Sequence, residues 1–268
     1  MNFFTCPICK KRLEREQRSL ICENRHCFDL SKKGYVNLLR SSKSSSARHG
    51  DDKLMVAART AFLGAGFYDP LRDSLTETVL AYAKDQAVLL DAGCGEGFYT
   101  SYVRQSLNGK IYGIDVSKDA IHAAAVRDKD LRLAVASIFD LPVENRSIDI
   151  LLNLFAPYDA EEFSRVLKTD GILIRVFPRE RHLWELKTAV YDVPYENEID
   201  TFALDGFTLL EKKEITFPLF LDQQEYIDTL FKMTPYYYKT SREGQAKLRA
   251  LDRLETHAEF FLTVYRKR

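Results

Sequence analysis

The chain has 268 residues and a mass of 30.9 kDa, and its 39 basic and 39 acidic side chains leave it with no net charge. This size is sufficient for one large hydrophobic core with a small appended unit. No apolar run approaches the ~20 residues that cross a bilayer, and the first residues do not form a secretory signal. We therefore expect a cytoplasmic protein without a membrane partner.

The neutral total conceals an uneven distribution of charge. Residues 1–50 contain eleven Lys or Arg and four Asp or Glu, a balance of +7, and the remainder of the chain carries the opposite balance. A basic N-terminal region favours a polyanionic partner such as a nucleic acid. A solvated basic surface would explain the charge equally well.

The chain divides into three segments of different composition. Residues 1–40 are rich in cysteine and basic residues and contain short alternating stretches typical of small strands. Residues 41–51 are rich in serine and show no apolar periodicity, which predicts a linker. From residue 52 to residue 268, helical and strand patterns alternate, so a larger globular domain is expected there.

Four of the five cysteines lie within the first 27 residues. Cys6 and Cys9 are two residues apart, and Cys22 is followed by His26 and Cys27. Two such ligand pairs predict a tetrahedral zinc site, because each pair fits one tight turn. Adjacent residues of a strand point to opposite faces, so either His26 or Cys27 is the fourth ligand. Four protein ligands predict a structural ion, which stabilises a segment too small to fold by apolar burial alone.

Residues 52–268 predict an α/β fold. Asp51 or Asp52 is the expected N-cap of a first helix that ends near Gly64 or Gly66, and a second helix spans roughly 70–84. Apolar runs of strand length follow, separated by helical or turn-rich segments, at residues 87–91, 111–115, 131–137, 148–153 and 171–177. They indicate a parallel sheet covered on both faces. Two late segments, 207–220 and 256–268, predict an antiparallel hairpin at its edge.

A glycine-rich loop follows the first of these strands. It has the pattern Asp-x-Gly-x-Gly-x-Gly at Asp91, Gly93, Gly95 and Gly97, and such glycines let the backbone turn sharply beside a ligand at a helix N-terminus. A dinucleotide fingerprint would need its third glycine at the position of Phe98. The loop is similar to that of Rossmann-like S-adenosylmethionine-dependent methyltransferases.

Polar residues stand at the ends of the next three strands. Asp115 ends the second strand, where a carboxylate can accept hydrogen bonds from both ribose hydroxyls. Asp140 follows the third strand, where a residue in this fold commonly contacts the adenine amino group, and Asn153 ends the fourth strand at the substrate rim. Each could equally be a turn or helix-cap residue. Their common position at one sheet edge favours a cofactor site.

The chain resembles the bacterial 23S rRNA (guanine-N1)-methyltransferases over nearly its whole length. The shared stretches are CPIC, ICxxRHxFD, KxGYVNLL, the DxGCGEG loop, the FAP turn, PRxRHLxELK and MTPYYYK. The resemblance implies a zinc ribbon for RNA recognition at residues 1–40 and a linker at 41–51. It also implies a Rossmann-like class I methyltransferase domain at 52–268, and a homodimer whose zinc units flank an RNA cleft.

The resemblance also assigns site residues and a substrate. It implies zinc ligands at Cys6, Cys9, Cys22 and His26. It implies further S-adenosylmethionine contacts at Tyr68, Glu96, Gly97 and His182. Members methylate N1 of a guanine in a domain II hairpin of 23S rRNA. One branch modifies one loop guanine, and another branch modifies its near neighbour and is associated with resistance to tylosin-type macrolides.

Methylation of guanine N1 requires an in-line approach of the methyl donor, an unstacked base, and either a general base or donors that stabilise charge at O6. Polar residues expected at the rim are Asn153, Asp159, Glu180 and His182, and we assign no general base among them. Basic residues expected to contact RNA phosphates are Lys10, Lys11, Arg12, Arg15 and Arg18. The aromatic run at 236–238 could stack on unpaired bases or belong to the core.

Two other functions are compatible with parts of this pattern. A small-molecule methyltransferase with a zinc-bearing oligomerisation unit would share the glycine loop but leave the basic segment without a role. A non-catalytic zinc-ribbon RNA-binding protein would not need the set of acidic and glycine residues from Asp91 to Asp140.

Overall fold

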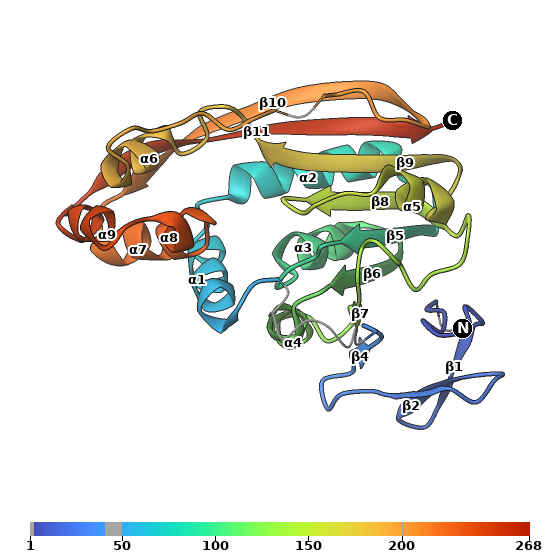
Figure 1. Ribbon diagram of the computed structural model, residues 1–268. Coiled ribbons are helices and arrows are strands. Elements are labelled where there is room, and N and C mark those ends of the chain that lie inside the picture. The colour runs from blue at the N-terminus through green and yellow to red at the C-terminus, as the bar shows by residue number, and fades with distance from the viewer. Residues whose placement is uncertain (1–2, 41–49, 200) are drawn as a thin grey trace.

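The computed structural model describes residues 3–40, 50–199 and 201–268 (Figure 1). It has an α/β fold with an eight-stranded mixed sheet and a three-stranded N-terminal sheet. Residues 41–49, most of the predicted linker, lie outside the described residues. Among the described residues, none of the helices is both long enough and apolar enough to span a bilayer.

The large sheet confirms the strands expected from the apolar runs. Its order is β10-β11-β9-β8-β5-β6-β7-β4, in which the strands from β9 to β4 are parallel and β10 and β11 are antiparallel. The strands are β4 (Val36–Asn37), β5 (Ala87–Ala92), β6 (Gly109–Asp115), β7 (Arg132–Val135), β8 (Ile148–Leu154), β9 (Leu167–Pro178), β10 (Phe207–Leu221) and β11 (Leu254–Lys267).

Nine helices are assigned within the described residues. Asp52 caps the first through hydrogen bonds from the backbone N–H groups of Leu54 and Met55, and the helix ends at Gly64, so the structure selects one of the two residues predicted for each end. The nine helices are α1 (Lys53–Gly64), α2 (Asp69–Tyr82), α3 (Phe98–Ser106), α4 (Lys118–Arg127), α5 (Ala160–Val166), α6 (Trp184–Val190), α7 (Gln224–Lys232), α8 (Tyr236–Lys239) and α9 (Arg242–Arg249).

Alternate residues of the central strands face two different hydrophobic cores. Leu89 and Ile150 belong to the core that includes buried residues of α1 to α4, whereas Leu90 and Leu151 belong to the core that includes α5 and the N-terminal unit. Both faces of the sheet are therefore covered, which explains why its central strands are continuous apolar runs.

The expected antiparallel pair lies at the sheet edge, where β11 pairs with both β9 and β10. The connection between β10 and β11 contains α7, α8 and α9, so the two strands are not joined by a tight turn. In Figure 1 these helices lie beside α1, beyond the ends of the parallel strands. This excursion supplies one wall of the site described below.

The N-terminal unit, residues 3–40, packs against the large sheet. It contains β1 (Leu13–Glu16), β2 (Ser19–Cys22) and β3 (Cys27–Asp29), and its last strand, β4, extends the large sheet beside β7. The Thr5 N–H donates to the Pro142 carbonyl at 2.7 Å, and Phe3 stacks on Tyr112 with ring centroids 3.8 Å apart. A two-residue strand such as β4 is too short to show periodicity in the sequence.

Candidate functional site

Three cysteines and one histidine converge in the N-terminal unit. The ligand atoms of Cys6, Cys9, Cys22 and His26 all lie within 4.8 Å of one another, and Cys27 is exposed and outside this group. The Cys9 Sγ–Cys22 Sγ distance is 3.6 Å, and the Cys22 Sγ–His26 Nδ1 distance is 3.4 Å. Ligands of a tetrahedral ion at about 2.3 Å are about 3.8 Å apart. The donor set and its spacing therefore fit a structural zinc ion with His26 as the fourth ligand.

Two similar turns bring these ligands together. The Lys10 N–H donates to the Cys6 carbonyl at 2.8 Å, and the Arg25 N–H donates to the Cys22 carbonyl at 2.8 Å. Lys10 and Arg25 both have left-handed backbones, with φ of 61° and 63°. This strained conformation is sparsely populated for residues other than glycine, and its repetition indicates that the surrounding structure enforces both turns.

A cavity of about 1740 Å³ opens at the carboxyl ends of β5, β6, β8 and β9. The glycine loop after β5 contributes residues 93–96 to its wall, and Asp115, at the end of β6, lies beside them. The backbone N–H groups of Gly95 and Ser117 donate to the two carboxylate oxygens of Asp115 at 2.9 and 2.8 Å. These bonds fix the carboxylate beside the loop, where each oxygen retains a lone pair for a further donor.

The glycines of the loop are required by its conformation. Gly93, Gly95 and Gly97 have φ of 96°, 56° and 80°, and a Cβ atom on Gly93 would lie 2.6 Å from the Cβ atom of Ala156. The loop thus bends where L side chains are strained and approaches the turn after β8 closely. It can therefore accommodate a ligand against its backbone.

Two buried carboxylates flank the loop. Asp91 accepts a hydrogen bond from the Thr100 hydroxyl at 2.5 Å, and burial raises the pKa of its carboxyl to about 7. Its Oδ1 atom has no partner in the described structure. Glu96 forms an ion pair with Arg127, yet burial raises the pKa of its carboxyl. A buried acceptor without a partner fits a site that is completed by a polar ligand.

Tyr68 and His182 line the same cavity, although they are far from the loop in sequence. Tyr68 is buried and packs edge-to-face on Phe62, with ring centroids 5.5 Å apart. The Nδ1 atom of His182 accepts a hydrogen bond from the Glu259 N–H at 3.0 Å. Its neutral imidazole must then carry the proton on Nε2, which makes it a hydrogen-bond donor rather than a base.

Burial, and then the charge of Lys187, lower the pKa of His182 to about 3. The unfolded chain, in which the pKa of histidine is close to 6.5, therefore binds a proton before the folded chain does. We expect this group to lower the free energy of unfolding by about 1–2 kcal/mol between pH 6.5 and pH 5. Urea denaturation at the two pH values measures this loss. His182→Gln should reduce this loss of unfolding free energy. His122→Gln, a substitution of an exposed histidine, should leave the loss unchanged. An unchanged loss in His182→Gln would contradict the assignment.

Two of the polar residues predicted at the strand ends do not line the cavity. Asp140 is half-exposed and forms an ion pair with Lys10 of the N-terminal unit. The cavity-lining residues of the loop after β7 are Ser137, Ile138 and Phe139. Asn153 is buried, and its amide donates to the carbonyls of Ala92 and Pro157, which braces the turn after β8. The position of a polar residue within its loop decides which side it faces, and this cannot be read from spacing alone.

Of the four rim residues considered for proton transfer, only His182 lines the cavity. Asp159 caps α5 by accepting a hydrogen bond from the Glu162 N–H at 3.0 Å, which explains its position in the sequence. Glu180 lies near Arg179, with 4.0 Å between the charged atoms.

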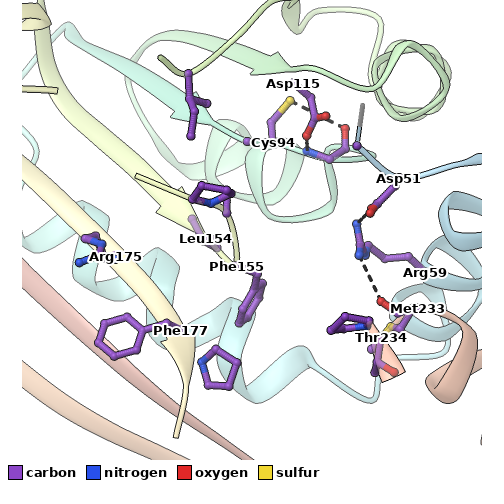
Figure 2. Close-up of a pocket in the computed structure, with 18 of the residues that line it drawn as sticks. Asp51, Arg59, Cys94, Asp115, Leu154, Phe155, Arg175, Phe177, Met233 and Thr234 are labelled. Atoms are coloured by element: carbon purple, nitrogen blue, oxygen red, sulfur yellow. Dashed lines mark hydrogen bonds and ion pairs between the residues drawn. The ribbon is translucent and has the colours of Figure 1, made fainter. Parts of the chain in front are cut away.

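The wall opposite the sheet was not predicted from the sequence. Arg59 of α1 forms an ion pair with Asp51 and donates to the Met233 carbonyl at 3.2 Å, which connects α1 to the end of α7 (Figure 2). Residues 233–236 of the MTPYYYK stretch also line the cavity. Tyr236 is buried there, whereas Tyr238 is exposed and donates to Asp52. The aromatic run is thus divided between the cavity wall and the surface.

The basic N-terminal residues have acidic neighbours. Lys10 pairs with Asp140, Lys11 with Glu23, and Arg12 with Glu144. Two of these pairs connect the N-terminal unit to the loop after β7. Exposed pairs of this kind contribute little free energy, so a phosphate could displace the carboxylates.

Comparisons with known proteins agree with this arrangement. The family described as "RlmA, N-terminal" matches residues 4–46, and the family described as "Methyltransferase domain" matches residues 83–215. A Bacillus subtilis protein named for 23S rRNA (guanine-N1)-methyltransferase activity is 35% identical over 267 residues, covering 93% of this chain and 92% of its own. The 23S rRNA (guanine(748)-N1)-methyltransferase of Streptomyces fradiae is 36% identical over 194 residues, covering 71% and 68%.

A solved structure supports the fold. It belongs to a complex between the Haloferax volcanii Trm112 methyltransferase activator and a methyltransferase, and it covers 81% of this chain and 99% of its own with a TM-score of 0.50 and 18% identity. The cavity, the zinc-ligand cluster and the similarity along the chain lead to one conclusion. The chain belongs to the 23S rRNA (guanine-N1)-methyltransferase family, whose S-adenosylmethionine-dependent methyltransferase domain follows an N-terminal zinc ribbon.

Proposed function

We propose that the chain transfers a methyl group from S-adenosylmethionine to N1 of a guanine in a domain II hairpin of 23S rRNA. The observation that carries this proposal is the combination, in one chain, of a Cys₃His cluster and a cavity lined by a glycine loop. The chain's family is named for the same reaction. We include in the proposal a zinc ribbon at residues 1–40 and a catalytic domain at 52–268. The proposal also includes a homodimer and a cytoplasmic location, both of which accord with a ribosomal RNA substrate.

The cavity supplies distinct contacts for the cofactor. We propose that the backbone of Gly93, Gly95 and Gly97 and the side chains of Tyr68, Asp91, Glu96 and His182 bind it. Asp115 is suited to the ribose, since its carboxylate is already held by two backbone N–H groups. Ser137 is a better candidate than Asp140 for the adenine edge, because Ser137 lines the cavity. Asn153 is assigned the role of holding the turn after β8.

S-adenosylmethionine supplies an electrophilic methyl group on a sulfonium. The protein would contribute mainly position, since the two walls of the cavity would hold the methyl donor and its acceptor in line. His182 would act there as a neutral Nε2–H donor. In the described part of the chain, none of the four residues considered for proton transfer is suited to be a general base, so stabilisation of the charge that develops on the guanine becomes the main requirement.

Ribosomal RNA from a strain that lacks this gene tests the proposal. Incubation with the protein and methyl-labelled cofactor should label the RNA, and reverse transcription should stop in domain II, because a methyl group on N1 blocks Watson–Crick pairing. The position of the stop distinguishes the two neighbouring loop guanines, one of which is associated with tylosin-type resistance. Label without a stop in domain II would overturn the nucleotide assignment, and no label in RNA would favour a small-molecule substrate or a non-catalytic role.

A further inference from the structure

The cavity is larger than one small cofactor requires. Its volume of about 1740 Å³ exceeds the roughly 300–1,000 Å³ typical of small-molecule sites. Strand order divides the cavity into two halves, because β6 and β7 lie on one side of β5, and β8 and β9 lie on the other. The contacts proposed above for the ribose and the adenine of the cofactor, Asp115 and Ser137, follow β6 and β7. The half over β8 and β9 therefore has room for a second ligand.

Aromatic side chains line the half of the cavity over β8 and β9. Phe155 lies in the turn after β8, and Phe177 lies near the end of β9. The side chain of Phe155 is 45% exposed, and its ring centroid lies 5.3 Å from that of Phe260, which also lines the cavity. In Figure 2, Phe155 lies between Phe177 on one side and the wall that contains Arg59 on the other. The uncovered part of the Phe155 ring thus faces the interior of the cavity.

The backbone at Phe155 is strained. Its φ of 55° lies in the left-handed region, which glycine, asparagine and aspartate adopt more readily than a bulky aromatic residue does. The Phe155 N–H donates to the Val176 carbonyl at 2.9 Å. Within the same turn, the Asn153 amide donates to the Pro157 carbonyl at 2.9 Å. Strained residues that neighbouring contacts hold in this way cluster at functional sites, so a half-exposed phenylalanine here indicates a ligand for its ring.

The turn that contains Phe155 also contacts the glycine loop. The next residue is Ala156, whose Cβ atom lies 2.6 Å from the position of a Cβ atom added to Gly93. The ring of Phe155 therefore belongs to a turn that packs on the loop proposed to hold S-adenosylmethionine. A flat ligand on this ring would lie beside the cofactor, at the border between the two halves of the cavity.

We propose that the half of the cavity over β8 and β9 is the nucleobase site, in which the unstacked target base of the RNA lies on the ring of Phe155. This inference rests on the proposed function and names the place where its methyl acceptor binds. A base that leaves its stack loses contact with its neighbours, and an aromatic side chain restores part of that contact. Every base has a π-face, so stacking on Phe155 holds the base without selecting guanine.

Two variants and a control test this role of Phe155. Phe155→Leu keeps an apolar side chain but removes the ring, and it should bind the 23S rRNA hairpin about tenfold more weakly in the presence of S-adenosylhomocysteine. Phe155→Tyr keeps the ring and should bind the hairpin within about threefold of wild type. The matched control is Phe220→Leu, because Phe220 is 63% exposed on β10, away from the lining of the cavity. It should bind the hairpin within about twofold of wild type.

Cofactor affinity shows in which half of the cavity Phe155 acts. Calorimetric titration of Phe155→Leu with S-adenosylmethionine should give an affinity within about threefold of wild type, whereas kcat/KM for the RNA should fall about tenfold or more. The same titration verifies that the variant is folded. Equal losses of affinity for the cofactor and for the RNA would overturn the inference, because they would place Phe155 in the cofactor site.

A hairpin that lacks the target base tests whether Phe155 contacts that base. Replacement of the methylated nucleotide by an abasic one should cost wild type about tenfold more affinity than it costs Phe155→Leu, since the variant has already lost the stack. The cost in Phe220→Leu should equal that in wild type. Equal costs in wild type and in Phe155→Leu would also overturn the inference.

Photochemical crosslinking requires no variant and therefore decides the question if Phe155→Leu does not fold. A hairpin with 6-thioguanine in place of the methylated guanine should crosslink to wild type within the tryptic peptide of residues 147–165, which contains Phe155. A crosslink confined to other peptides would contradict the proposed nucleobase site. If wild type labels no RNA, the proposed function itself fails. If wild type labels RNA and the abasic hairpin shows no coupling to Phe155, only the nucleobase site fails.

Discussion

The variant Gly93→Ala should bind S-adenosylmethionine at least about 100-fold more weakly than wild type, since backbone strain and a steric clash each cost on the order of 1–3 kcal/mol. Gly93 has a φ of 96°, and an added Cβ atom would lie 2.6 Å from that of Ala156. Accommodating the methyl group requires either the loop or the turn after β8 to move, and both line the cavity. Calorimetric titration with the cofactor and with S-adenosylhomocysteine measures the effect.

Two other glycines provide graded controls for this experiment. Gly95 also has a positive φ, of 56°, but the nearest neighbour of an added Cβ atom is Arg59 Nη1 at 3.8 Å, so Gly95→Ala should show the strain without the clash. An added Cβ atom on Gly64, at the end of α1, has no neighbour within 4 Å, and Gly64→Ala should bind like wild type. Cofactor affinity in Gly93→Ala within about threefold of wild type would show that the loop does not hold the ligand as proposed.

Loss of the metal should have the second large effect. Cys22→Ser should reduce zinc from one equivalent per chain to a small fraction and lower the midpoint of thermal unfolding by at least about 10 °C, because a structural zinc site contributes on the order of 10 kcal/mol to folding. Cys22 is buried in a core that also contains Tyr112 and Val143 of the large domain. Loss of the metal should therefore destabilise the large domain as well as the zinc ribbon. Metal analysis and calorimetric melting measure both quantities.

The chain contains a matched control for the metal site. Cys27 is an exposed thiol one residue after His26 and lies outside the ligand cluster. Cys27→Ser should therefore retain the full zinc content, and His26→Gln should lose it. The opposite pattern would make Cys27 the fourth ligand. S-adenosylmethionine binding should survive in Cys22→Ser at temperatures below its lowered midpoint, since most of the residues that line the cavity belong to the large domain.

Local features of the site were predictable because local physical chemistry determines them. Glycines at 93, 95 and 97 and the spacing of Cys6, Cys9 and Cys22 indicate ligands through backbone freedom and turn geometry within a few residues. The Asp52 cap and the continuous apolar strands were predictable for the same reason. Asp140 and Asn153 show the limit of this approach, because Asp140 lies in the loop after β7 and Asn153 near the end of β8, yet neither lines the cavity.

The sequence by itself determined the classes of chemistry: a thiolate-rich metal site, a glycine loop at the end of a buried strand, and a parallel sheet that places other strand ends beside it. Tertiary structure decided which residues complete each site. It selected His26 over Cys27 and placed the α7–α8 segment and α1 across the cavity. These pairings join residues far apart in the chain. Their proximity depends on strand order and on which side chains the packed core leaves at its surface, and the spacing of residues in the sequence contains neither.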